Sequence, residues 1–183
     1  MSSAIGIIVG FIFGFLSCWL FWRFQLTVKP IFSVSSQVAS WPNQNNPARK
    51  VYQIKIVNLS SRPIINMRAK LGVHELILYE RGHRRPTIYN IEMSPSSSEA
   101  ILGPKRKVID PWSITNIHYY TARPDKIIED LFIGERRLVF TIQATDATSN
   151  TTIIRRYTYS KEDIVEGKFK PGDMMEIIPL ISH

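Results

Sequence analysis

The first 22 residues of this chain carry no charged side chain, and every Lys, Arg, Asp and Glu lies from Arg23 onward. Residues 4–22 form an uncharged run of about 19 residues, which as an α-helix would span roughly 28 Å, close to the hydrocarbon thickness of a bilayer. Its C-terminal end carries aromatic side chains such as Trp19 and Phe24, which favour the membrane interface. We therefore predict a single transmembrane helix over residues 1–24 and expect the protein in the cell membrane.

A cleaved signal peptide is the alternative interpretation of this segment. Such a peptide needs a basic region before its apolar core, a shorter core and a small-residue cleavage site after it. Here only Met-Ser-Ser precedes the core, and WRFQLTVKP follows it. The sequence favours a retained anchor.

The charges that flank the helix predict its orientation. No Lys or Arg precedes the helix, whereas Arg23, Lys29, Arg49 and Lys50 follow it. The positive-inside rule then places the N-terminus outside and the C-terminal domain in the cytoplasm. Cys18, the one cysteine, lies inside the apolar run, so no disulfide can form within the domain. This fits a reducing compartment.

Three glycines in the helix repeat at a spacing of four residues. Gly6, Gly10 and Gly14 therefore share one helix face, and such strips of small residues allow two helices to approach closely. The strip predicts a helix-packing face and a homo-oligomer. The alternative is that glycine is simply frequent in membrane helices.

The remainder of the chain alternates apolar and polar residues with period two, between turns at regular intervals. The strands expected at 51–57, 64–71 and 137–144 place on one face, respectively, Tyr52, Ile54 and Ile56; Ile65, Met67, Ala69 and Leu71; and Leu138, Phe140, Ile142 and Ala144. This pattern is typical of a β-sandwich. We predict a mainly β fold, an immunoglobulin-like β-sandwich over 51–183, with a linker and first strand at 25–50.

Two short helices are expected within this sandwich. Residues 125–131 have room for about two helical turns. Residues 160–167 begin with a capping-box-like Ser-Lys-Glu-Asp and end at a glycine.

Catalytic and metal-binding signatures are not recognisable. The sequence has no phosphate-binding glycine loop, no HExxH, no CxxC and no GxSxG, and its four histidines lack metal-ligand spacing. We therefore expect no enzymatic activity, no cofactor and no bound metal. An enzyme with a site assembled from distant residues is the alternative.

The formal net charge of +8 indicates anionic partners. Beside a membrane these are lipid headgroups, and tethering argues against nucleic acid. The predicted sites for lipid headgroups or other anions are Arg23, Lys29, Arg81, Arg84, Arg85, Lys105, Arg106 and Lys107.

The order of features resembles the cytoplasmic immunoglobulin-like domain of inward-rectifier potassium channels, over about residues 51–175. The segments that carry the resemblance are VYQIKIVNLSSRPIINMRAKLGV (51–73), DPWSITNIHYYTARPDKIIEDL (110–131) and RLVFTIQATDATSNTTIIRRYTYSKEDIVEGKFKP (137–171). The resemblance implies a domain that packs as a tetramer beneath the membrane. One helix replaces the family's two and the filter motif is missing, so this chain alone cannot form a selective potassium channel.

These observations lead to one expected function and two alternatives. We expect a single-pass, membrane-anchored, non-enzymatic protein whose cytoplasmic sandwich is an oligomeric binding, sensing or regulatory module, with membrane lipids and a protein among its partners. A membrane-perturbing effector that assembles through its glycine-lined helix is the first alternative. The enzyme with a cryptic site is the second.

Overall fold

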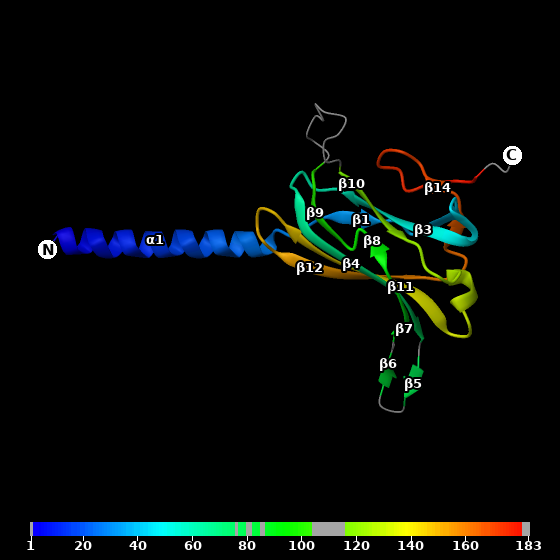
Figure 1. Ribbon diagram of the computed structural model, residues 1–183. Helices are drawn as coiled ribbons and strands as arrows, with labels where there is room; N and C mark the ends of the chain where they lie inside the picture. Colours follow the sequence, from blue (N-terminus) through cyan, green and yellow to red (C-terminus); the bar gives the residue numbers. More distant parts are fainter. Residues whose placement is uncertain (1, 76, 80–81, 85–86, 104–115, 181–183) are drawn as a thin grey trace.

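A computed structural model describes residues 2–75, 77–79, 82–84, 87–103 and 116–180 of this chain. One long helix, α1 (Ser2–Thr27), projects from one end of a domain built of β-strands (Figure 1). By length and composition, Ala4–Thr27 is apolar enough to cross a membrane, and a signal sequence near an N-terminus has the same properties. The protein is therefore mainly β, with one N-terminal helix that has the character of a membrane anchor or of a signal sequence.

The larger sheet is centred on β3. Its strands are β1 (Phe32–Val34), β2 (Val38–Asn43), β3 (Asn46–Asn58), β8 (Met93–Ser94), β10 (Ile117–Ala122) and β13 (Ile164–Glu166). They follow the order β13-β2-β3-β10-β8, and β1 pairs with the end of β3. All pairs are antiparallel except β13 with β2. Residues 25–50 thus contain the end of α1, all of β1 and β2, and the start of β3.

The second sheet is centred on β4 and β11. Its strands are β4 (Ile64–Glu75), β7 (Thr87–Ile91), β9 (Ser97–Ile101), β11 (Arg136–Asp146) and β12 (Thr152–Tyr159). They follow the order β12-β11-β4-β7, with β9 also paired to β4, and every pair is antiparallel. The strand β12 is therefore an edge of this sheet.

Smaller elements complete the described part of the chain. They are two hairpins, β5 (Ile77–Tyr79) with β6 (Gly82–Arg84) and β14 (Lys168–Phe169) with β15 (Ile177–Ile178), and one 3-10 helix, η1 (Ile128–Leu131). The hairpin of β5 and β6 extends away from the two sheets (Figure 1).

One core lies between the two sheets and follows the alternation of the sequence. Tyr52, Ile54 and Ile56 of β3 are buried, as are Leu138, Phe140, Ile142 and Ala144 of β11. Both predicted faces are confirmed. Period-two burial from two sheets onto a shared core is the arrangement of a β-sandwich.

The predicted inner face of β4 is wrong at its first residue. Ile64 is fully buried, whereas Ile65 is half-buried. Asn66 adopts a positive φ of 50°, and the register of β4 against β11 shifts at this point. An extra residue in one strand reverses which side chains face the core, and Asn tolerates the left-handed conformation that this bulge needs.

The prediction of two short helices within the sandwich is also wrong. Within 125–131 only η1 forms, because Ile128 is buried and its N–H donates to the Tyr52 hydroxyl at 2.9 Å. Residues 160–167 form no helix at all. The Asp163 carboxylate accepts the Ser160 N–H at 2.7 Å and closes a single turn, after which the chain pairs with β2 as β13. The capping-box pattern stabilises that turn alone.

The bulge at Asn66 gives a direct test of this core. We expect Ile64→Ala to lower the free energy of unfolding by about 2–5 kcal/mol, because it removes a fully buried side chain. We expect Ile65→Ala to cost clearly less. Denaturant unfolding of the two full-length variants in detergent measures the difference, and an equal or reversed ranking would contradict the bulge.

Candidate functional site

The predicted helix-packing residues lie on α1 with open space around them. A Cβ added at Gly6, Gly10 or Gly14 would meet no atom within 4 Å. Within the described single chain no second element packs against this strip. Helix packing and the homo-oligomer therefore stay predictions.

The predicted cationic sites fall in two places. Arg23 lies over the Trp19 ring at 5.9 Å, and Lys29 is exposed just after α1, so both lie near the end of the helix. Of the others, Arg84 is placed only as part of the backbone of β6. Outside the described residues lie Arg81, Arg85, Lys105, Arg106 and Lys107.

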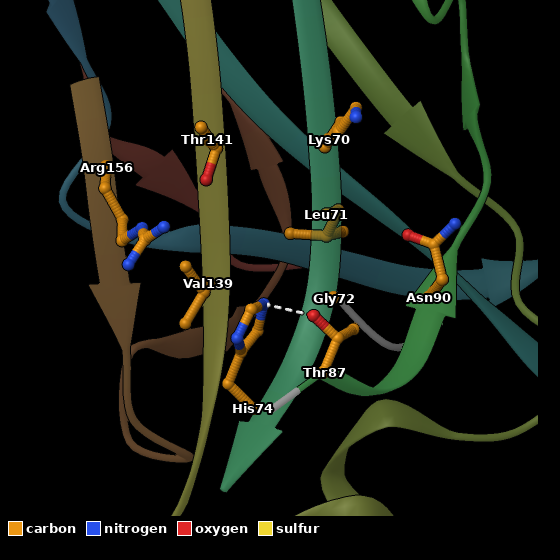
Figure 2. A pocket seen from close by; sticks show the side chains of 9 residues that line it. All are labelled: Lys70, Leu71, Gly72, His74, Thr87, Asn90, Val139, Thr141 and Arg156. Carbon is orange, nitrogen blue, oxygen red and sulfur yellow. Dashed lines mark hydrogen bonds between the residues drawn. The ribbon is translucent and has the colours of Figure 1, made fainter. Parts of the chain in front are cut away.

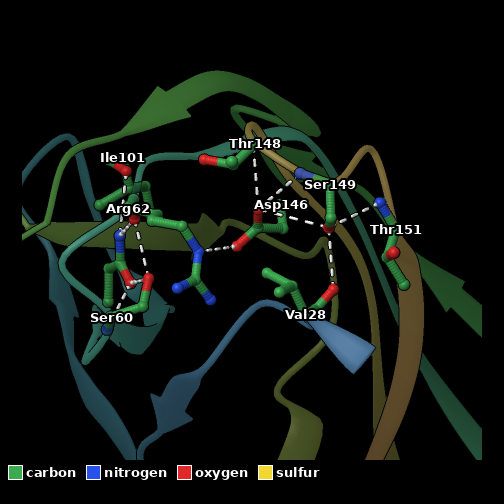
Figure 3. Close-up of polar contacts among 9 residues, drawn as sticks. Val28, Ser60, Arg62, Ile101, Asp146, Thr148, Ser149 and Thr151 are labelled. Carbon is green, nitrogen blue, oxygen red and sulfur yellow. Dashed lines mark hydrogen bonds and ion pairs between the residues drawn. The ribbon is translucent and has the colours of Figure 1, made fainter. Parts of the chain in front are cut away.

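A buried carboxylate organises the end of the sandwich that adjoins α1. Asp146 ends β11 and is fully buried. Its Oδ2 accepts a hydrogen bond from Arg62 Nε at 2.8 Å, and its Oδ1 accepts the N–H groups of Thr148 and Ser149 at 2.9 and 3.0 Å (Figure 3). Asp commonly closes turns in this way, by accepting backbone N–H groups two and three residues later. We call residues 146–151 the junction loop.

The junction loop contacts the chain where it leaves the helix. The Ser149 hydroxyl donates to the carbonyl oxygen of Val28 at 2.8 Å, and Val28 directly follows α1 (Figure 3). The Val28 N–H in turn donates to the Gln25 carbonyl oxygen at 3.1 Å. One loop of the sandwich therefore holds the exit of the helix.

The loop that carries Arg62 is itself fixed by a buried amide. Asn58 Nδ2 donates to the carbonyl oxygens of Arg62 and Ile101 at 2.8 and 3.2 Å, and Asn58 Oδ1 accepts the Ser60 N–H at 2.9 Å (Figure 3). A fully satisfied buried polar group favours one loop conformation. Asn58 therefore fixes the backbone of the loop from which the Arg62 side chain reaches Asp146.

The charge state of Asp146 follows from these contacts. Burial alone would raise the pKa of its carboxyl, but the hydrogen bond from Arg62 and those from Ser149 and Thr148 outweigh burial, and the pKa lies below the usual range. A depressed pKa in the folded state means that the carboxylate stabilises the fold above its unfolded pKa. That stability is lost as the pH falls through the folded-state value.

A shallow cleft lies on the outer face of the second sheet. Its volume is about 230 Å³, and it is lined by Lys70, Leu71, Gly72, His74, Thr87, Asn90, Val139, Thr141 and Arg156 (Figure 2). We call it the outer cleft. Gly72 gives it its depth, because a Cβ there would meet Thr87 Cγ2 and the Tyr89 carbonyl oxygen at 3.1 Å. His74 Nε2 lies 3.2 Å from Thr87 Oγ1 at one side.

Two cations flank the outer cleft. Thr141 of β11 lies opposite Lys70 of β4 on one side and opposite Arg156 of β12 on the other. Strands that flank a common neighbour are about 10 Å apart, and directly opposite residues project on the same face. Lys70 and Arg156 are both exposed. This arrangement suits a carboxylate or phosphate group held over Thr141.

A buried lysine outside these regions, Lys55, is engaged by the protein itself. The ammonium of the buried Lys55 donates to the carbonyl oxygens of Lys170 and Met174, both at 2.7 Å, and burial lowers its pKa despite the opposing charge of Asp173. Lys55 fixes the C-terminal segment on the outer face of the first sheet.

Glu129 holds η1 against β3. Burial alone would raise the pKa of Glu129, but hydrogen bonds from the Tyr52 hydroxyl and from Lys50 Nζ, the latter at 2.9 Å, hold it below the usual range. No group of three His, Cys, Asp or Glu side chains among the described residues is placed to hold a metal ion. The expected lack of enzymatic activity and of a cofactor stays a prediction.

Sequence reasoning missed both the junction loop and the outer cleft. Nothing local in the sequence indicates that Asp146 pairs with a side chain 84 residues away. Lys70 is an ordinary outward residue of an alternating strand. Its proximity to Arg156 depends on the order of three strands in the sheet.

Comparisons with known proteins give only distant similarities. No protein-family model matches this chain, and no curated protein matches it either. One similar solved structure is the ASH/PapD-like domain (PapD-like domain 7) of human CEP192, with a TM-score of 0.38 and 9% identity, covering 76% of this chain and 89% of that chain. Another is Spo0M, a sporulation control protein from Bacillus subtilis, with a TM-score of 0.35 and 9% identity; 75% of this chain matches 49% of that chain, about half its length. At such TM-scores neither structure assigns a function.

The resemblance to inward-rectifier potassium channels is wrong. Two similar solved structures are a PapD-like domain and Spo0M, and neither is the cytoplasmic domain of such a channel. The sequence segments that suggested the resemblance are alternating strands and turns, which many sandwiches share. Residues 160–167, which the resemblance required to be helical, contain β13 instead, and residues 110–115 lie outside the described part of the chain. The tetramer implied by the resemblance loses its basis.

The junction loop yields a prediction with a matched control. We expect Asp146→Asn to lower the free energy of unfolding by about 1–3 kcal/mol at neutral pH, since it removes a charge-assisted hydrogen bond to a buried carboxylate from the partly exposed Arg62. Asp125→Asn breaks the exposed pair with Arg49 and should cost about 0–1 kcal/mol. Because Asp146 is protonated in acid, the deficit should shrink as the pH falls below the usual range of an aspartate. Urea unfolding across pH measures it, and an unchanging deficit would contradict the assigned charge.

Proposed function

We propose that this protein is a membrane-anchored, non-enzymatic binding module. In this proposal α1 holds the protein in the cell membrane, and the sandwich presents the outer cleft to a partner that carries a carboxylate or phosphate group. A homo-oligomer formed through Gly6, Gly10 and Gly14 remains compatible with the proposal but is not needed for it.

The exposed apolar surface of α1 carries the first half of the proposal. Ile7, Phe11 and Phe15 are 73%, 76% and 68% exposed, and apolar side chains cover the helix on all sides. Burial of such a side chain is worth about 1.5–3 kcal/mol, so an isolated helix of this kind is strongly disfavoured in water. A long helix that is apolar all round belongs in a bilayer or in a large protein core. The sandwich supplies no such core, since α1 projects away from it (Figure 1).

Charge supports a cytoplasmic sandwich. Arg23 lies in the last two turns of α1 and Lys29 is exposed just beyond the helix, so both cations lie on the side where the sandwich begins. Membrane helices retain their Lys- and Arg-rich flank on the cytoplasmic side.

The charge and accessibility of the outer cleft support the second half of the proposal. Lys70 and Arg156 lie on either side of Thr141 at an open surface, whereas the buried Lys55 and the partly buried Glu129 have partners within the protein. A cleft flanked by two cations can hold an anionic group, with hydrogen bonds from a hydroxyl and an amide of its lining. Thr87 Oγ1 and His74 Nε2 lie 3.2 Å apart at one side of the cleft, whereas the two cations flank Thr141, and we favour binding over catalysis because the cations suit an anionic group.

Anchoring and orientation are tested together in intact cells. We expect protease added outside the cells to leave an epitope at the C-terminus intact and to destroy it after lysis. The mass of the membrane-extracted protein should include residues 1–24. A digested epitope in intact cells would overturn the orientation, and a protein that lacks the helix would show that the segment is a cleaved signal peptide.

The outer cleft is tested by charge reversal in the full-length protein. We expect Lys70→Glu and Arg156→Glu each to weaken binding of a poly-glutamate peptide about tenfold, the usual scale for loss of one charge-assisted contact. Lys126→Glu makes the same change of net charge on an exposed residue outside the cleft and serves as the control. Isothermal titration in detergent measures the affinities. If all three variants lose affinity equally, the peptide senses only net charge, and the cleft is not a site.

A further inference from the structure

Two aliphatic side chains are exposed side by side where the sandwich meets the helix. Ile31 is 53% and Leu59 is 57% exposed. The Leu59 N–H donates to the Ile31 carbonyl oxygen at 3.0 Å, which continues the register that pairs Phe32 with Asn58. Directly opposite residues of an antiparallel pair project on the same face with Cβ atoms about 5 Å apart. Phe32 and Asn58 are buried, so the next pair, Ile31 and Leu59, faces outward.

The position of this pair is fixed relative to α1. Ile31 follows the last residue of the helix, Thr27, by four positions, and Ser149 holds Val28 in between. A helix of 26 residues is about 39 Å long, whereas a bilayer is about 30 Å thick in its hydrocarbon core and about 40–45 Å with its headgroups. If α1 spans the bilayer, its last turn lies among the headgroups. Ile31 and Leu59 then lie next to that layer.

We infer that Ile31 and Leu59 form a second membrane contact, in which the sandwich inserts this apolar pair into the lipid surface at the boundary between headgroups and acyl chains. The inference rests on the proposed anchoring by α1 and adds a contact that the anchor does not require. Lys29 lies two residues before Ile31 and is exposed, as suits an anionic headgroup beside the inserted side chains. The contact would hold the sandwich against the bilayer and would restrict its rotation about the connection to α1.

The size of the patch argues for lipid and against a protein partner. Two side chains provide far less than the roughly 800 Å² that each partner buries in a typical protein interface. A lipid surface needs no such area here, because the helix already holds the patch beside it and the second contact is intramolecular in effect. A small apolar pair is therefore sufficient for a tethered membrane contact.

Nitroxide labels on the full-length protein test this contact. Cys18→Ala removes the native cysteine, and single labels are then placed through Leu59→Cys, Ile31→Cys, Ile12→Cys and Ile133→Cys, in vesicles of phosphatidylcholine and phosphatidylglycerol. Ile133 is 63% exposed and precedes β11 at the end opposite to Asp146, so it is a matched control for Leu59. Ile12 lies within α1 and reports the anchor. Power saturation compares collisions with oxygen, which concentrates in lipid, and with a water-soluble nickel complex.

We expect the ratio of oxygen to nickel accessibility at positions 59 and 31 to be severalfold above the ratio at 133, and highest at 12. Water-like ratios at 59 and 31 with a lipid-like ratio at 12 would overturn the second contact and leave the anchor intact. A water-like ratio at 12 would overturn the anchor itself, and with it the inference. The label at 31 keeps the test decisive if Leu59→Cys does not fold.

Discussion

The buried carboxylate of Asp146 joins three parts of the chain that are distant in sequence. Arg62, from the loop between β3 and β4, donates to one oxygen, and the backbone of the junction loop donates to the other. The same loop positions the Ser149 hydroxyl on the carbonyl oxygen of Val28, directly after α1. A buried charge without these partners would cost several kcal/mol, so the loops have one favourable arrangement. The direction in which the helix leaves the sandwich depends on that arrangement.

This constraint connects the anchor to the rest of the molecule. A flexible linker would let the sandwich rotate freely at the membrane, and its faces would have no fixed relation to the bilayer. A fixed junction instead sets which surfaces approach the lipid and which remain open. In the proposed arrangement it brings Ile31 and Leu59 toward the membrane side, while the outer cleft lies on the face of the second sheet, between β7 and β12. The proposed anchoring, lipid contact and partner binding would then use different surfaces of one rigid unit.

Local sequence pattern predicted the elements that depend on local physics. The uncharged run before Arg23 forms a long helix, and alternation in β3 and β11 gives the two buried faces of the core. The local pattern predicted the wrong buried face where one residue changes the periodicity of a strand. Asn66, with its positive φ, places Ile64 in the core in place of Ile65. At 160–167 a capping pattern predicted a helix, but pairing with β2 outweighs a weak helical tendency.

The sites depend on pairings that no local pattern reports. Arg62 and Asp146 are separated by 84 residues, and each looks like an ordinary turn residue in the sequence. The outer cleft requires the strand order β12-β11-β4-β7, which brings Lys70 and Arg156 to either side of Thr141. The resemblance to a channel domain was wrong because it rested on local strand and turn patterns alone. Strand-and-turn order is shared among sandwiches, whereas these long-range contacts belong to the particular chain.

The rigidity of the junction is the central claim, and a distance distribution tests it most directly. In the Cys18→Ala background, one spin label replaces Phe24 near the end of α1 and another replaces Ile133 at the far end of the sandwich, both exposed positions. Pulsed dipolar spectroscopy of the full-length protein in a bilayer should give one narrow distribution, which broadens in Asp146→Asn. A broad distribution in the parent protein, unchanged by that substitution, would mean that helix and sandwich move independently and would contradict the account.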